Sequence, residues 1–180
     1  MRLSSMLRNK SRPESLDTTA SCDIHIDITE EFISVNGMKF SIPCHKDELK
    51  SIFGEWMFSM DNITGTSLRY IYIWHEIGIV AYSKDDENVN CVLIQFYPSE
   101  KKKAINLPKK VFGGSVTVNG ESWITLFKEE KYLRIERIRM PLKLVHYGNF
   151  TLCMSGDTKH KKSIKSLGIN QKTTLGLGGK

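Results

Sequence analysis

The segment ISVNGMKFSIP at residues 33–43 has a counterpart in VTVNGESWITL at residues 116–126. Each segment places Asn-Gly between apolar residues that alternate with polar ones. Asn-Gly suits a two-residue type I′ turn, because both residues tolerate the positive φ that this turn requires. The pattern therefore predicts two antiparallel hairpins, which pair 32–35 with 38–42 and 115–118 with 121–126.

A helix is expected after the first hairpin. In CHKDELKSIFGEWMF (44–58), acidic residues occupy the first turn, where the helix dipole favours them. Apolar residues then recur on one helical face, at Leu49, Ile52, Phe53 and Trp56. We therefore expect a helix over 46–58. After the second hairpin, the segment with Leu133, Ile135 and Ile138 fits a helix or a strand, and Pro141 ends it.

Each half then continues with a second hairpin. Its arms are 68–74 and 77–83 around His75-Glu76, and 142–146 and 150–155 around Tyr147-Gly148-Asn149, while 89–98 adds a strand to the first half. The predicted class is α+β, with antiparallel β-hairpins and one or two packed helices. The repeated order predicts an imperfect internal duplication with half-units 32–98 and 112–157. Chance recurrence of Asn-Gly hairpins in a β-rich chain is the alternative.

Charge is unevenly distributed along the 180 residues, whose net charge is +6. Residues 21–100 hold five Lys/Arg and 13 Asp/Glu, 101–157 hold 11 and five, and 158–180 hold six lysines and no acid. Such segregation indicates an electrostatic partner, although a solvated surface can also show it. We expect a flexible leader at 1–20, one domain at 21–157 and a basic helix and tail at 158–180, with Gly168 as the helix stop.

Composition argues against several classes of protein. No apolar run approaches the ~18 residues of a membrane span, and the N-terminal segment lacks a secretory h-region. The four cysteines form no C-x-x-C pair, so we expect reduced thiols in a cytoplasmic protein. A zinc site would need Cys22, His25, Cys44 and His45, but Cys22 and His25 fall on opposite faces of a strand. We expect no metal and no cofactor.

A small hydrolase or nuclease is an alternative function. His75 and Glu76 are adjacent at a turn, and His146 could act as a second general acid or base. The sequence contains no G-x-S-x-G, P-loop, Rossmann fingerprint or H-E-x-x-H motif. Adjacent residues also usually point in different directions, so polar turn residues are the simpler interpretation.

Binding to nucleic acid is a third interpretation. Tyr70, Tyr72 and Trp74 share one strand face and could stack bases, although the same face suits a core. The basic residues Lys159, His160, Lys161, Lys162 and Lys165 could contact phosphates. No aromatic residues are interleaved with them, and the acidic first half interrupts a continuous basic footprint. We therefore favour core packing and a solvated tail.

The segment YIWHEIGIVAYS and the later FGGSVTVNG resemble a poorly characterised family of small bacterial proteins associated with secreted-toxin and immunity loci. The resemblance covers about residues 32–125. Where this chain has His75, an acidic residue is usual in the family. The shared positions are Tyr72, Trp74, Glu76, Ile77, Gly78, Ile79, Tyr82, Ser83, Phe96, Phe112, Gly114, Val118, Asn119 and Gly120.

This resemblance implies an immunity-type protein that binds a cognate toxin and blocks it by occlusion, without catalysis. An acidic surface would speed association with a basic toxin. The partner expected is thus a protein rather than a nucleic acid or a membrane. The acidic candidates for the interface are Asp23, Asp27, Glu30, Glu31, Asp47, Glu48, Glu55, Asp85, Asp86 and Glu87.

Overall fold

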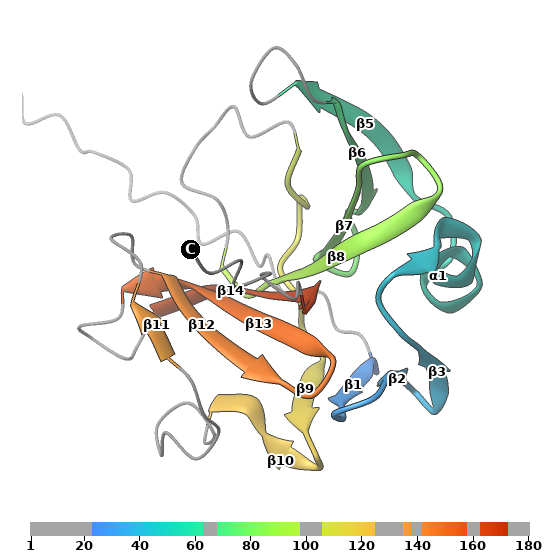
Figure 1. Ribbon diagram of the computed structural model, residues 1–180. Helices are drawn as coiled ribbons and strands as arrows, with labels where there is room; N and C mark the ends of the chain where they lie inside the picture. Colours follow the sequence, from blue (N-terminus) through green and yellow to red (C-terminus); the bar gives the residue numbers. More distant parts are fainter. Residues whose placement is uncertain are drawn as a thin grey trace, which may run out of the picture.

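The first Asn-Gly hairpin belongs to a small five-stranded sheet (Figure 1). The computed structural model describes residues 23–62, 68–97, 106–124, 135–137, 142–157 and 163–172. The small sheet has the order β10-β9-β1-β2-β3, and β1 pairs antiparallel with β2 and parallel with β9. Its strands are β1 (His25–Ile28), β2 (Ile33–Val35), β3 (Met38–Phe40), β9 (Ser115–Val118) and β10 (Glu121–Ser122).

Both Asn-Gly predictions are confirmed. Asn36 and Gly37 have φ of 49° and 88°, and Asn119 and Gly120 have φ of 51° and 74°. These are the left-handed conformations that a type I′ turn needs at both central positions. The first turn joins β2 to β3 and the second joins β9 to β10. The outer arm of the second hairpin is shorter than predicted, since β10 ends at Ser122.

The large sheet has nine strands in the order β11-β12-β13-β14-β8-β7-β6-β5, with β4 paired beside β8. Every pairing in it is antiparallel. The strands are β4 (Cys44–His45), β5 (Met57–Asn62), β6 (Leu68–Trp74), β7 (Ile79–Ser83), β8 (Asn88–Gln95), β11 (Ile135–Arg137), β12 (Leu142–Tyr147), β13 (Phe150–Asp157) and β14 (Ser163–Gln171).

The strand order of the large sheet is symmetric. The four strands β5 to β8 form a meander, β11 to β14 form another, and the two meet where β8 pairs antiparallel with β14. In the small sheet, the β2–β3 and β9–β10 hairpins lie on either side of β1. A duplicated hairpin unit followed by a meander would produce this arrangement. The duplication itself stays a prediction.

The main apolar core lies between the two sheets. Ile26, Ile33 and Val118 from the small sheet, at most 2% exposed, belong to the same buried cluster as Ile94 and Leu167 from the large one. Alternation puts one face of each strand into this core. A smaller cluster of Ile71, Ile73 and Val80 lies on the opposite face of β6 and β7.

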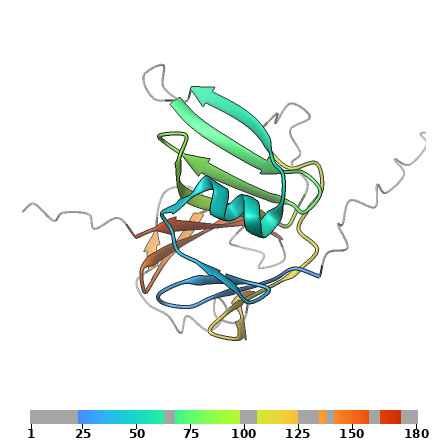
Figure 2. The same ribbon diagram turned by 90° about the vertical axis from the view of Figure 1, so that its right-hand side faces the viewer.

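Helix α1 (Lys46–Phe53) lies at one side of the molecule, beside both sheets (Figure 2). Leu49 is fully buried, and Ile52 and Phe53 pack against the core. The helix ends at Gly54, whose φ is 82°, so it is shorter than the predicted 46–58. Trp56 still packs on the core, but Met57 and Phe58 already belong to β5.

The fold class differs from the prediction. The antiparallel hairpins are confirmed, but α1 is the one α-helix whose full extent lies within the described residues, so the class is β-rich rather than α+β with packed helices. The ambiguous segment after the second hairpin contains strand β11.

The predicted basic helix within 158–168 is wrong where it is described, because 163–171 form strand β14. Leu167 and Ile169 alternate into the core, and Gly168 stands mid-strand opposite Cys153 and Leu93 instead of ending a helix. The folded body therefore extends past residue 157 to Gln171. The leader at 1–20 lies outside the described residues.

Candidate protein-binding surface

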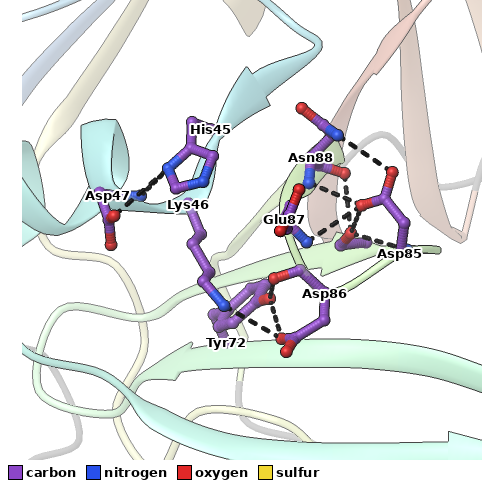
Figure 3. A network of polar contacts seen from close by, with 9 residues as sticks. His45, Lys46, Asp47, Tyr72, Asp85, Asp86, Glu87 and Asn88 are labelled. Atoms are coloured by element: carbon purple, nitrogen blue, oxygen red, sulfur yellow. Dashed lines mark hydrogen bonds and ion pairs between the residues drawn. The ribbon is translucent and has the colours of Figure 1, made fainter.

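The turn between β7 and β8 is organised by Asp85 (Figure 3). Its Oδ1 accepts hydrogen bonds from the backbone N–H groups of Asn88 at 2.7 Å and Glu87 at 3.0 Å. Its Oδ2 accepts from the Asn88 side chain at 3.0 Å, and Ser83 Oγ donates to Oδ1 at 3.1 Å. These donors, the Asn88 backbone first, hold the pKa of Asp85 far below its ordinary value. The turn is therefore a fixed anionic loop near neutral pH.

Asp86 joins this turn to the core and to the helix. Its φ is 64°, a conformation that Asn and Asp tolerate better than most residues. The buried Tyr72 hydroxyl lies 2.7 Å from Asp86 Oδ1 and 2.8 Å from its carbonyl oxygen. Lys46 Nζ lies 3.4 Å from the same carboxylate (Figure 3). The Lys46 backbone N–H donates to the Glu87 carbonyl at 2.9 Å.

The N-terminus of α1 brings two further acids to this place. His45 caps the helix: its Nδ1 accepts from the Asp47 backbone at 3.3 Å, and Glu48 Oε1 accepts from the His45 backbone at 3.2 Å. Because β4 pairs with β8, His45 lies opposite Asn88. Five of the ten acidic candidates thus collect in one region, which we call the acidic corner: Asp47, Glu48, Asp85, Asp86 and Glu87.

The other five acidic candidates lie elsewhere. Asp23 is exposed just before β1, and Glu55, beyond the helix, pairs with Lys50 at 2.8 Å. Asp27 accepts bonds from Thr117 Oγ1 and from the Gly120 backbone, so it supports the β9–β10 turn. Glu30 and Glu31 occupy the connection from β1 to β2. The structure therefore does not bring all ten acids to one face.

Exposed apolar side chains adjoin the acidic corner. Phe58, Met60 and Leu68, on β5 and β6, are 46%, 56% and 52% exposed. Pairing places Phe58 opposite Tyr72, and the two rings lie 5.9 Å apart. Phe58 and Asp86 thus both contact Tyr72, on the same face of the large sheet. The acidic corner and this apolar group are therefore linked through the buried Tyr72.

The aromatic residues of the motif are buried in the hydrophobic core. Tyr72 and Trp74 are 1% and 4% exposed, so they are not a base-stacking platform. Trp74 Nε1 donates to the Gly54 carbonyl at 2.9 Å, and its ring packs edge-on against Phe53 and Trp56. The preference for a core interpretation is confirmed.

The motif glycines mark close backbone contacts. Gly78 has a φ of 75°, and a Cβ there would lie 2.2 Å from the Phe112 nitrogen. A Cβ on Gly114 would lie 2.1 Å from the Ile24 carbonyl oxygen. The two parts of the motif, IGI and FGG, therefore meet in space, because the Phe112 backbone lies against Gly78 in the β6–β7 turn. Gly78 and Gly114 therefore allow close backbone packing.

His75, Glu76 and His146 do not form one site. His75 Nδ1 accepts from the Lys109 backbone at 3.2 Å, and its Nε2 lies 3.3 Å from Met57 Sδ. Burial, and secondarily Lys109, lowers the pKa of His75. Glu76 pairs with Lys110, while His146 on β12 lies 3.0 Å from Thr151 Oγ1. Strands β7, β8, β14 and β13 separate β6 from β12.

The described residues offer no other evident centre of chemistry. They contain no cluster of three or more His, Cys, Asp or Glu side chains that could hold a metal ion. Cys44, Cys91 and Cys153 are free thiols, and burial raises the pKa of Cys44 to about 12. No helix in the part that the structure describes is long and apolar enough to cross a membrane.

Sequence reasoning missed a polar ladder on the exposed face of the small sheet. Ser115 Oγ lies 2.8 Å from His25 Nδ1, and Thr117 Oγ1 donates to Asp27. These pairs arise because β1 and β9, 90 residues apart, align in parallel. A local pattern contains no signal for such a pairing.

One comparison with known proteins gives a match. A family described as a domain of unknown function (DUF7738) matches residues 25–133, more than half of the chain. The chain belongs to this family. The matched range begins at β1 and includes the small sheet, α1 and the first meander; it ends before β11. No curated protein and no solved structure matches the chain.

Proposed function

We propose that this protein binds a basic protein through the acidic corner and the adjoining apolar side chains, and occludes it as an immunity protein occludes a toxin. The observation that carries the proposal is the shared contact of Phe58 and Asp86 with Tyr72. That contact joins exposed apolar area to fixed negative charge on one face.

The composition of this surface suits protein recognition. Interfaces combine an apolar, often aromatic centre with a polar rim. Here Phe58, Met60 and Leu68 would form the centre and the acidic corner part of the rim. Because hydrogen bonds fix Asp85 and Asp86, the rim would lose little conformational freedom on binding.

Charge supports a basic partner. Residues 44–97, which include the acidic corner, hold four Lys/Arg and eight Asp/Glu. Complementary charge speeds association and suppresses partners of the wrong sign. The toxin class rests on the resemblance of the motif segments to immunity-associated proteins, since the description of the matched family gives no function. A cytoplasmic site of action belongs to the same proposal.

The direct experiment is co-purification with the tagged full chain from its native cells at low and moderate salt. We expect one stoichiometric basic protein that is toxic alone and harmless when co-expressed with this chain. Two charge-matched variants then test the surface. Glu87→Lys reverses an exposed charge in the acidic corner, whereas Glu121→Lys does so on β10 of the small sheet.

Glu87→Lys should slow association of the co-purified protein by about tenfold and weaken its salt dependence. Glu121→Lys should leave both unchanged. Equal effects of the two substitutions would show that net charge, rather than this surface, drives binding. Failure to retain any basic protein at either salt would contradict the proposed function itself.

A further inference from the structure

Strand β5 is an edge of the large sheet with little protection. It pairs with β6 from Met57↔Ile73 to Asn62↔Leu68 without a register shift. Among the described residues, no strand pairs with its other side. Its sequence, MFSMDN, contains no Lys, Arg or Pro. An edge of this kind exposes unpaired backbone donors and acceptors, which proteins usually protect with charge, proline, a bulge or a cover.

The other sheet edges differ from β5. Strands β11, β3 and β10 have three, three and two residues, against six in β5. Strand β3 also carries the exposed Lys39, a common guard against edge pairing. Short or charged edges are poor templates for a further strand. Among the described edges, β5 alone is long and uncharged over its first four residues.

Exposed apolar side chains concentrate at this edge. Of the seven exposed large apolar side chains in the described residues, four belong to β5 and its neighbour β6: Met57, Phe58, Met60 and Leu68. Met57 points to one face of the sheet, and Phe58 and Met60 to the other. A strand added beside β5 could therefore bury apolar side chains on both faces.

Side-chain contacts on both faces of the sheet hold strand β5 in place. Ser59 Oγ donates to Asn106 Oδ1 at 2.8 Å, and Met57 Sδ contacts His75 Nε2 at 3.3 Å. The Phe58 ring lies 6.2 Å from the Tyr70 ring. These contacts preorganise the edge, which reduces the entropy lost when a partner pairs with it.

We propose that an extended segment of the basic partner adds to the large sheet as a strand beside β5. This inference rests on the proposed function and specifies how the partner docks. Main-chain hydrogen bonds would supply affinity, and side-chain contacts would supply specificity. The segment should alternate apolar residues, facing Phe58 and Met60, with polar ones, and should carry Lys or Arg toward the acidic corner.

A second copy of this chain fits the edge less well. Antiparallel pairing of two β5 strands would place together two regions that each hold four Lys/Arg and eight Asp/Glu. Like charges oppose such a contact, whereas a basic segment relieves the repulsion. Charge complementarity therefore selects a foreign basic strand.

The test uses the full chain and the basic protein co-purified with it, both purified, in equilibrium binding and sedimentation measurements. Met60→Lys and Met60→Glu place opposite charges on β5, where Met60 is 56% exposed. Met38→Lys is the matched control, on the β3 edge of the small sheet, where Met38 is 47% exposed. Circular dichroism and urea unfolding verify that all three variants fold.

We expect both Met60 variants to weaken binding at least tenfold and Met38→Lys to leave it within twofold. If Met60→Glu binds more tightly than wild type, attraction is electrostatic only and strand docking is overturned. Wild-type affinity of both Met60 variants overturns it too, while leaving the proposed function intact. A wild-type dimer that Met60→Lys converts to monomer would overturn it in favour of a second copy. A wild-type chain that binds no basic protein would contradict the proposed function, and the docking inference with it.

Discussion

Replacing Gly78 by alanine should destabilise the protein far more than the same change at Gly120. The two glycines have nearly the same φ, 75° and 74°. They differ in the space around the missing Cβ. At Gly120 it would meet nothing within 4 Å, whereas at Gly78 it would lie 2.2 Å from the Phe112 nitrogen and 2.6 Å from the Val111 carbonyl carbon. The pair therefore separates backbone strain from steric contact.

The expected magnitudes follow from these two terms. A left-handed alanine costs roughly 1–2 kcal/mol, offset by about 0.4–1 kcal/mol from the stiffer unfolded chain. Gly120→Ala should thus lose about 1 kcal/mol. Gly78→Ala must also displace the backbone of Phe112, whose N–H donates a hydrogen bond to the Gln95 carbonyl oxygen. Overpacking adds about 1–3 kcal/mol and the lost hydrogen bond about 1 kcal/mol, for a total near 3–5 kcal/mol.

Urea unfolding followed by tryptophan fluorescence measures both losses, and an unchanged m-value would show that the comparison is sound. A difference of about 2–4 kcal/mol between the variants is the expected result. If the two losses agree within about 1 kcal/mol, the contact between the IGI turn and Phe112 is not tight in solution. The structural interpretation of the motif would then be wrong.

Three further changes test other parts of the fold. Leu167→Ala, at a fully buried position on β14, should cost about 2–5 kcal/mol in urea unfolding, and a loss below ~1 kcal/mol would contradict the central place of β14. Tyr72→Phe removes the hydroxyl bonded to Asp86 and should cost about 1–2 kcal/mol, with faster amide exchange in 84–88; unchanged exchange would show that this bond does not hold the turn. The pKa of His75 is lowered in the folded state, so stability is present above its ordinary pKa of about 6.5 and falls as pH drops through the folded pKa. From pH 7.5 to pH 5.5, the free energy of urea unfolding should therefore fall less in His75→Asn than in wild type. An equal fall in the two proteins would exclude this contribution of His75.

Local chemistry explains which elements were predictable. The Asn36-Gly37 and Asn119-Gly120 turns depend on two adjacent residues, so the sequence contains the whole signal. The hairpin of β6 and β7 and the strand β8 were also predictable, because their β-rich segments are bounded by turn residues.

The errors arose where long-range pairing decides the structure. The lysines and the expected stop at Gly168 favour a helix, but β14 is held between its sequence neighbour β13 and β8, which lies about 70 residues earlier in the chain. The predicted helix includes the first two residues of β5, because Met57 and Phe58 continue its apolar run. In the structure Gly54 ends α1, and β6 pairs with the residues that follow.

The candidate surface was partly visible in the sequence. Composition identifies the acidic residues, but only the pairing of β4 with β8 brings the N-terminus of α1 beside the β7–β8 turn. The exposed edge at β5 carried no sequence signal, because Phe58 and Met60 resemble core residues until their exposure is known. The basic tail cannot be deleted as a test of function, since residues 163–171 are a central strand.

Amide hydrogen exchange of the full chain, alone and with its co-purified basic protein, tests the central claim most directly. Backbone N–H groups of an antiparallel strand point alternately to its two sides, so the amides of β5 that point away from β6 should exchange rapidly in the free protein. Binding should protect amides within 57–62 and 84–88, and leave β3 and β10 unchanged. Protection confined to the small sheet or to the second meander, with β5 unchanged, would contradict the proposed binding surface.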